Sequence, residues 1–167
     1  MRDPIKVVHV MRTYGVRGGE QQVSQFFMIS QHSRLDQSFV SLFSDKKCAE
    51  LLKKRAPSLK YSTLSKKSPI QRKAWGELFQ LLFPYIYLVL KFRRILVGEK
   101  PNIIVAHGFQ AALICWPLLI TKHGFKSVYV QRAAKADRLI NWYFKLLYKP
   151  FYILDIDITG DDKKKIK

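Results

Sequence analysis

The stretch that most constrains the fold is a short apolar run followed by a glycine-rich turn. Residues 6–11 (Lys-Val-Val-His-Val-Met) are rich in β-branched side chains, and Gly15, Gly18 and Gly19 lie within five positions of one another just behind them. The apolar side chains after the turn recur at helical spacing. This order predicts a strand, a tight turn and a helix, which is the opening of a Rossmann-like unit.

A glycine-rich turn at the start of a helix has two interpretations, and the sequence leaves both open. Glycines let backbone N–H groups approach a ligand closely, and the helix N-terminus favours an anion such as phosphate. Glu20 in the first turn also suits the helix dipole. Alternatively, the glycines only make the bend. Their spacing is not that of the dinucleotide fingerprint GxGxxG, which argues against a nicotinamide cofactor.

The rest of the chain alternates between strand and helix patterns. Strands are predicted at 37–44, 59–64, 100–108, 127–131 and 155–160, and helices at 48–55, 111–121 and after residue 160. This alternation predicts an α/β domain with a doubly wound, mostly parallel sheet. A length of 167 residues is that of a single domain.

The charge of the chain limits its partners. The net charge is +18, whereas 48% of the residues are apolar and 13% are aromatic, so we expect a folded protein that binds nucleic acid, anionic lipid or phosphorylated substrates. Cys48 and Cys115 are far apart and have no histidine cluster beside them, so neither a metal site nor a disulfide is predicted. The N-terminus lacks the apolar stretch of a signal peptide, and we expect a cytoplasmic chain.

One basic and aromatic segment, residues 71–96, differs from the rest. Its uncharged centre, 78–90, is too short to span a bilayer, and no acidic residue occurs between Glu77 and Glu99. Pro84 should kink the helix or begin a second one. The segment is predicted to be a helix pair at a membrane interface, or alternatively a core helix with a solvated basic face.

A second segment, 135–151, repeats the basic and aromatic mixture and is predicted to be another interfacial helix. Across the two segments, the residues expected to contact the membrane are Arg72, Lys73, Trp75, Lys91, Arg93, Arg94, Trp142, Lys145 and Lys149.

Parallel sheets bind ligands at the carboxyl ends of their strands. His107 and Arg132 each follow a predicted strand, so topology should bring them close to the turn at 15–19. His107 is a candidate for catalysis or substrate contact, although a histidine at a strand end is also often a structural hydrogen-bonding residue.

The order of these motifs resembles the N-terminal domain of GT-B glycosyltransferases, specifically the large retaining family 4 of group 1 transferases. The matching features are 7–10 leading to 18–20, then 100–108, and finally 155–160 with a helix after it. The resemblance covers nearly the whole chain. It implies that this domain binds the acceptor and that a second domain, which these residues do not include, binds the nucleotide-sugar donor.

The resemblance also implies roles for individual residues. The loop residues Gly15, Gly18, Gly19 and Glu20 would face the donor diphosphate or an acceptor phosphate, while Arg132 and the catalytic candidate His107 would line the acceptor side. Family members often have a histidine where this chain has Gln131-Arg132, so a histidine role there is in doubt. Without a donor domain, the chain alone should not transfer sugar.

The expected function is therefore the N-terminal half of a membrane-associated glycosyltransferase acting on a lipid-linked or lipopolysaccharide or polysaccharide acceptor. Its expected partners are that acceptor, an anionic membrane surface at the inner face of the cytoplasmic membrane, and a donor-binding domain or subunit, with no cofactor besides the nucleotide-sugar. A basic nucleic-acid-binding module is the alternative, although no zinc-finger, RNP-like or helix-turn-helix pattern supports it. A dehydrogenase or methyltransferase would need a complete GxGxxG or GxGxG turn.

Overall fold

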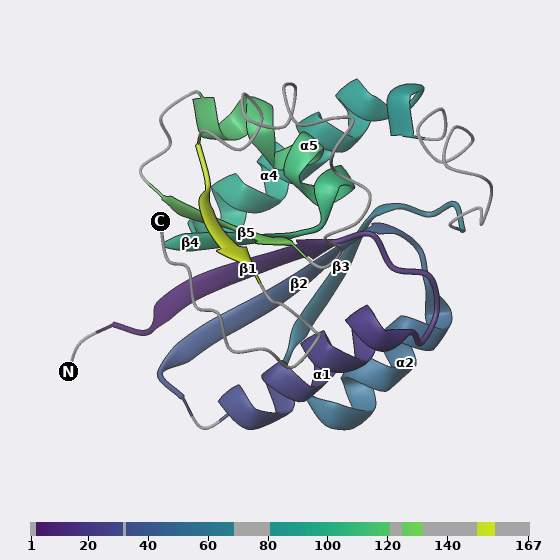
Figure 1. Ribbon diagram of the computed structural model, residues 1–167, viewed down its shortest axis with the longest axis vertical. Coiled ribbons are helices and arrows are strands. Elements are labelled where there is room, and N and C mark those ends of the chain that lie inside the picture. Colours follow the sequence, from purple (N-terminus) through teal and green to yellow (C-terminus); the bar gives the residue numbers. More distant parts are fainter. Residues whose placement is uncertain (1–2, 32, 69–80, 121–124, 132–149, 156–167) are drawn as a thin grey trace.

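The computed structural model describes residues 3–31, 33–68, 81–120, 125–131 and 150–155, which form a sheet with helices on both faces (Figure 1). The strands are β1 (Ile5–Met11), β2 (Leu35–Phe43), β3 (Lys60–Ser65), β4 (Ile103–His107), β5 (Lys126–Gln131) and β6 (Tyr152–Asp155). The helices are α1 (Gly18–Ser30), α2 (Lys46–Arg55), α4 (Tyr85–Glu99) and α5 (Phe109–Ile120).

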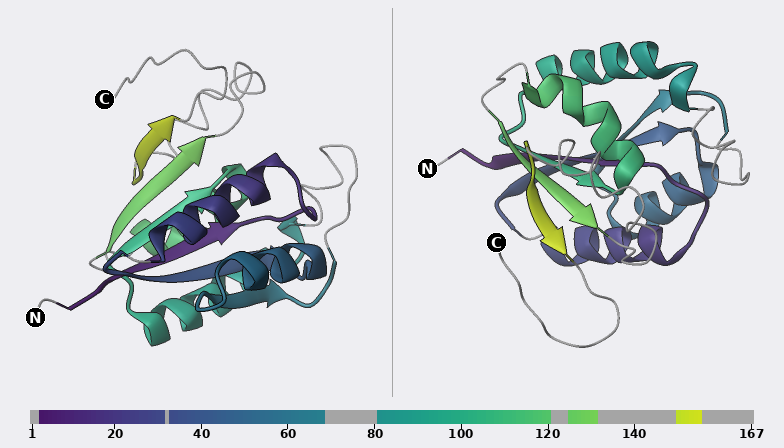
Figure 2. Two further views of the ribbon diagram at one scale, coloured as in Figure 1. Left: turned by 90° about the horizontal axis from the view of Figure 1, so that it is seen from below. Right: turned by 45° about the horizontal axis from the view of Figure 1, so that its top comes forward.

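The sheet has six parallel strands in the order β3-β2-β1-β4-β5-β6. The chain adds β2 and β3 on one side of β1, then returns to add β4, β5 and β6 on the other side. Right-handed crossovers therefore place α1 and α2 on one face and α4 and α5 on the opposite face, as the views in Figures 1 and 2 show. The predicted doubly wound fold is confirmed.

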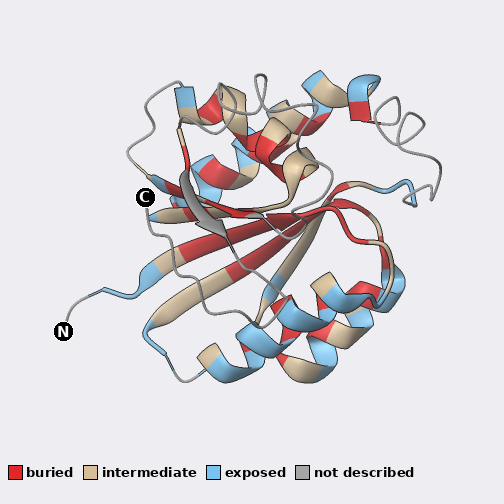
Figure 3. Ribbon diagram, viewed as in Figure 1, coloured by how far each residue is buried: buried red, intermediate tan, exposed pale blue. Residues whose placement is uncertain are grey.

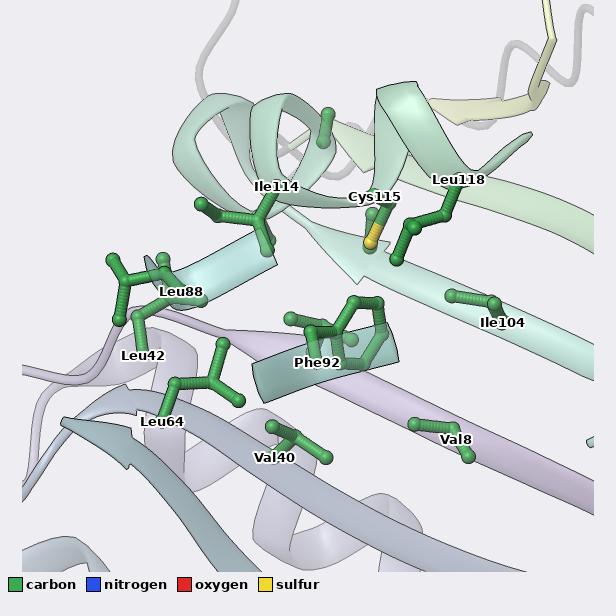
Figure 4. Close-up of a cluster of buried hydrophobic side chains, with 14 of the residues drawn as sticks. Val8, Val40, Leu42, Leu64, Leu88, Phe92, Ile104, Ile114, Cys115 and Leu118 are labelled. Atoms are coloured by element: carbon green, nitrogen blue, oxygen red, sulfur yellow. The ribbon is translucent and has the colours of Figure 1, made fainter. Parts of the chain in front are cut away.

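The core has two layers because both faces of the central strands are covered. In β1, Val8 and Val10 belong to the cluster under α4 and α5, whereas Met11 belongs to the cluster under α1 and α2. The carboxyl-terminal parts of β1 and β2, in the middle of the sheet, are accordingly buried (Figure 3). Figure 4 shows the larger cluster, in which Leu88 and Phe92 from α4 meet Val8, Val40 and Ile104 from the sheet.

Pro84 interrupts the helical segment that the sequence predicted around it. Leu81 and Leu82 are helical, Pro84 occupies the N-cap position of α4, and α4 then continues to Glu99. Proline fits here because the first positions of a helix need no intrahelical N–H bond. Leu88, Phe92 and Leu96 follow at helical spacing and are buried. Residues 69–80, the first part of the predicted helix pair, lie outside the described residues.

The last described strand, β6, begins before the strand predicted at 155–160. Its residues Tyr152–Asp155 pair in register with Val128–Gln131 of β5, and it shares only Asp155 with the predicted range. Residues 156–167, with the helix expected after 160, lie outside the described residues, as does the greater part of the predicted helix at 135–151. The other predicted strands and helices agree with the structure to within a few residues.

Candidate functional site

The candidate site lies where β1 and β4 end side by side. Strand order reverses between these two strands, because the chain leaves β1 toward β2 but leaves β4 toward β5. At such a switch point the loops diverge and leave room for a ligand at the carboxyl edge of the sheet. Arg12 to Arg17 follow β1, and His107 to Gln110 end β4 and begin α5.

The glycine-rich turn after β1 is held by two carboxylates of the chain. Glu20, whose side chain is buried, accepts the backbone N–H of Tyr14 at 2.8 Å and that of Arg17 at 3.2 Å. Asp45, at the start of α2, accepts the N–H of Gly15 at 2.5 Å and caps α2 through the N–H of Cys48 at 3.1 Å. Three amides of this turn are therefore bonded within the protein.

These bonds divide the predicted anion-binding loop into two parts. The N–H groups of Tyr14, Gly15 and Arg17 shape the turn, and Gly15 has a φ of +93°, which a residue with a side chain rarely adopts. Helix α1 begins at Gly18, where first-turn amides have no intrahelical partner. A ligand role for Gly18 and Gly19 stays a prediction. The carboxylate of Glu20 accepts hydrogen bonds from two amides of the loop.

His107, the predicted catalytic residue, is paired with a second histidine that the sequence reasoning missed. Its Nε2 lies 3.0 Å from Nδ1 of His9, and the two ring planes are nearly parallel, at 19°, with centroids 5.3 Å apart. His9 is only 4% exposed, and its ring meets the edge of Phe27 at 4.8 Å. The sequence signal was available, because His9 is the polar residue inside the otherwise apolar run from Val7 to Met11.

Arg12 is the second residue that sequence reasoning missed. The residue is 5% exposed, and its guanidinium lies 4.9 Å from the ring centre of Tyr14 and 5.0 Å from that of Phe43 and donates to Oε1 of Gln110 at 2.9 Å. The exposed Arg17 lies over the same Tyr14 ring at 5.6 Å. Two cations thus gather on one aromatic ring at the carboxyl edge of the sheet.

This arrangement suits an anionic or hydroxyl-rich ligand better than covalent chemistry. Imidazole, guanidinium and amide groups can donate hydrogen bonds to phosphate or sugar oxygens. Burial raises the pKa of Cys48 to about 12 and raises that of Cys115, so neither thiol is a nucleophile at neutral pH. Among the described residues, no group of three metal-ligating side chains is present.

The structure brings together several of the residues predicted for the site. His107 and the turn containing Gly15, Gly18 and Glu20 lie at the same edge of the sheet. Arg132 lies outside the described residues, as do six residues predicted to contact the membrane, namely Arg72, Lys73, Trp75, Trp142, Lys145 and Lys149.

Helix α4 has an exposed face that is apolar and cationic, which we call the α4 stripe. Its residues, with the two that precede the helix, are Leu82, Phe83, Ile86, Tyr87, Leu90, Arg93, Arg94 and Val97. Phe83 is 92% exposed and Ile86 is 73% exposed. No acidic side chain belongs to the stripe, and Glu99 beyond it lies 3.8 Å from Lys60 of β3.

Lys91, which is also predicted to contact the membrane, does not belong to this stripe. Its ammonium turns toward the sheet and donates to the carbonyl of Leu64 at 2.8 Å, because the position falls on the inner side of α4. A hollow of about 360 Å³ lies along Leu90, Arg93, Arg94 and Val97, and another of about 200 Å³ lies between the end of α4 and Leu118 of α5. In the part of the chain that the structure describes, no helix is long and apolar enough to cross a bilayer.

Comparison with known proteins adds to the description of the fold. No protein-family model and no curated protein sequence matches the chain. A solved UDP-N-acetylglucosamine 2-epimerase aligns over 93% of this chain and 42% of its own, with a TM-score of 0.52 and 12% identity. The UDP-GlcNAc 2-epimerase from Neisseria meningitidis, bound to UDP-GlcNAc, aligns over 82% of this chain and 35% of its own, with a TM-score of 0.50 and 15% identity.

These epimerases have a GT-B-like fold, and at such identities the likeness concerns the fold alone. The chain spans less than half of the length of the two structures. It therefore forms one GT-B-like, Rossmann-like α/β domain, which confirms the fold expected from the sequence.

Proposed function

We propose that this chain is the acceptor-binding, N-terminal half of a glycosyltransferase that works at an anionic membrane surface. The acceptor is a lipid-linked or cell-envelope polysaccharide molecule, and a second domain or subunit supplies the nucleotide-sugar. The protein is peripheral on the inner face of the cytoplasmic membrane. The GT-B-like fold supports a sugar-nucleotide-related role, since the solved neighbours act on UDP-GlcNAc.

The site at the carboxyl edge of the sheet supports an acceptor-binding role. His107, Arg12 and Gln110 offer donors for hydroxyl and phosphate oxygens. Such groups bind and orient a sugar or a sugar phosphate, and His107 can exchange a proton with an acceptor hydroxyl. The chain needs no metal or organic cofactor for these tasks.

The α4 stripe is the observation that carries the membrane part of the proposal. A solvated helix face normally mixes acids and bases, whereas this face combines large exposed apolar side chains with two arginines. Apolar side chains can enter the boundary between headgroups and acyl chains while the arginines meet lipid phosphates. An anionic bilayer offers a binding partner both for the apolar side chains of the stripe and for its arginines.

Vesicle co-sedimentation tests the proposal, with anionic against zwitterionic vesicles over a range of salt concentrations. Each basic residue near an anionic surface contributes about 1 kcal/mol. The double substitution Arg93→Gln/Arg94→Gln should therefore weaken binding to anionic vesicles by about 30-fold, since 1.4 kcal/mol is a factor of ten. Phe83→Ala should weaken it by a comparable factor, because burial of a phenylalanine contributes about 1.5–3 kcal/mol.

Lys91→Gln is the matched control. It removes one positive charge from the same helix, where the arginine pair removes two, but its ammonium is bonded to Leu64 and faces the sheet. Its vesicle binding should stay within about twofold of that of the unmodified chain, since its charge lies away from the lipid. Equal losses for Lys91→Gln and the arginine pair would remove the role given to the stripe. Tighter, steeply salt-dependent binding to nucleic acid than to lipid would favour the nucleic-acid module instead.

A further inference from the structure

Four exposed lysines lie together at the carboxyl edge of the sheet, where β2 and β3 end. We call them the edge lysines: Lys46, Lys47, Lys66 and Lys67. The first two begin α2, and the last two follow β3. Phe43, the last residue of β2, pairs with Ser65, the last residue of β3. The N–H of Ser44 also donates to the carbonyl of Lys67 at 3.1 Å, so the two pairs of lysines are neighbours.

The charges of the edge lysines are not neutralised by ion pairs. Among the described residues, none of the four forms a salt bridge. Asp45 precedes Lys46, but it is buried and its carboxylate accepts the backbone amides of Gly15 and Cys48. Glu50 is the other acid nearby, and it lies one turn further along α2. Positive charge therefore exceeds negative charge at this edge.

The position of Lys46 and Lys47 opposes the dipole of α2. The first turn of this helix holds no acidic residue, and the last turn holds Lys53, Lys54 and Arg55. Cations are favourable at the C-terminal end of a helix and unfavourable at the N-terminal end, where the backbone N–H groups favour an anion. The cations of the last turn thus stabilise the helix, whereas those of the first turn do not. A bound anion would give the first-turn pair a role.

We propose that the edge lysines bind a diphosphate, a ligand with two linked phosphate groups. Lysine binds phosphate as a point charge, and four neighbouring ammonium groups favour an anion with several charges over one with a single charge. A compact anion suits them, because the cation Lys53 lies about 10 Å further along α2, beyond Glu50.

The edge lysines adjoin the candidate site. Asp45, which precedes them, bonds to Gly15 in the turn after β1, so a diphosphate would be held at the same edge of the sheet as that turn. The inference rests on the proposed function only for the molecule that carries the diphosphate, which would there be a lipid-linked acceptor.

Calorimetric titration with inorganic pyrophosphate at low salt tests the inference on the 167-residue chain. Lys46→Gln/Lys47→Gln removes one pair of edge lysines. Lys53→Gln/Lys54→Gln is the matched control, because it removes the same charge from exposed positions of the same helix. The first variant should bind pyrophosphate about tenfold more weakly, and the control should stay within about twofold of the unmodified chain. Lys66→Gln/Lys67→Gln should lose as much as the first variant.

Urea unfolding separates a ligand role from a structural one. Lys46→Gln/Lys47→Gln should be at least as stable as the unmodified chain, because it removes cations that oppose the dipole of α2. Lys53→Gln/Lys54→Gln should be slightly less stable for the converse reason. A marked loss of stability in the first variant would overturn the inference, since the lysines would then serve the fold.

Farnesyl diphosphate distinguishes the two sources of the ligand group. Tighter binding than that of pyrophosphate would assign a lipid-linked diphosphate, and equal binding would assign a soluble one. Absence of pyrophosphate binding would overturn the inference. Equal losses in the first-turn and last-turn variants would also overturn it, because they indicate a general charge effect such as nucleic acid would exploit.

The diphosphate site and the α4 stripe can fail independently. Helices α2 and α4 cover opposite faces of the sheet (Figure 1), so Lys46→Gln/Lys47→Gln should leave the binding of anionic vesicles unaltered. Loss of pyrophosphate binding with vesicle binding retained, in that variant, is the expected result. A failure of the inference is thus distinguishable from a failure of membrane docking.

Discussion

Replacing Asp45 with asparagine tests whether the glycine-rich turn is held from within the protein. Asp45 is buried, and its two carboxylate oxygens serve different elements: Oδ1 caps α2 at Cys48, and Oδ2 accepts the N–H of Gly15 in the turn. Asparagine is as good an N-cap as aspartate. It has one oxygen, however, and its NH₂ group cannot accept the second amide.

The structure sets the magnitude of the effect. A hydrogen bond to a charged group contributes about 1.5–3 kcal/mol, so Asp45→Asn should lower the free energy of unfolding by about 2 kcal/mol. Asp45→Ala loses the cap as well, which adds about 1 kcal/mol. Asp36→Asn is the control, because its ion pair with Lys60 at 3.6 Å is partly exposed and should contribute less than about 1 kcal/mol.

Urea unfolding followed by circular dichroism measures these differences. The expected order of stability is the unmodified chain and Asp36→Asn, then Asp45→Asn, then Asp45→Ala. An Asp45→Asn variant as stable as the unmodified chain would refute the reasoning. Asp45 would then act only as a helix cap, and the Gly15 amide would be available to a ligand.

Three further predictions concern the core. Phe92→Ala should lower the free energy of unfolding by about 3–5 kcal/mol in the same urea assay, because Phe92 is fully buried between α4 and the sheet; a loss below about 1 kcal/mol would contradict this packing. Cys48 and Cys115 should resist a thiol reagent at neutral pH until the chain is unfolded, since burial raises both pKa values and leaves almost no thiolate; rapid labelling of the folded chain would contradict it. Burial also raises the pKa of Tyr61 to about 12, as it does for Cys48. The free energy of unfolding should therefore be highest below the ordinary thiol pKa of 9.0. It should fall as pH rises toward 12, because the unfolded chain loses these protons at a lower pH than the folded chain does. A melting temperature that stays constant over that range would exclude this linkage.

The sequence predicted the fold well because the signals of the strands are local. β-Branched runs at 6–11 and 100–108 and the breaks at Pro84 and the glycines mark the limits of elements without knowledge of their neighbours. The strand at 152–155 was predicted only at its last residue, because no local pattern sets 152–154 apart from the alternating acidic and apolar residues from 155. Its pairing with β5, a long-range contact, identifies it.

The site was predicted less completely because its partners lie far apart in the sequence. His9 and His107 are 98 residues apart, as are Arg12 and Gln110, and no local pattern pairs them. The inward direction of Lys91 also depends on a carbonyl 27 residues away. Charge alone placed Lys91 with Arg93 and Arg94, although only the two arginines face outward.

The most direct test of membrane docking is a fluorescent reporter on the α4 stripe. Because both native thiols are buried, a cysteine introduced by Phe83→Cys can be labelled selectively with a polarity-sensitive dye, and Glu50→Cys on exposed α2, across the sheet, gives the matched control. On addition of anionic vesicles, the account predicts that the dye at residue 83 shifts to shorter wavelength and that the dye at residue 50 does not. No shift at residue 83, or equal shifts at both positions, would contradict docking through α4.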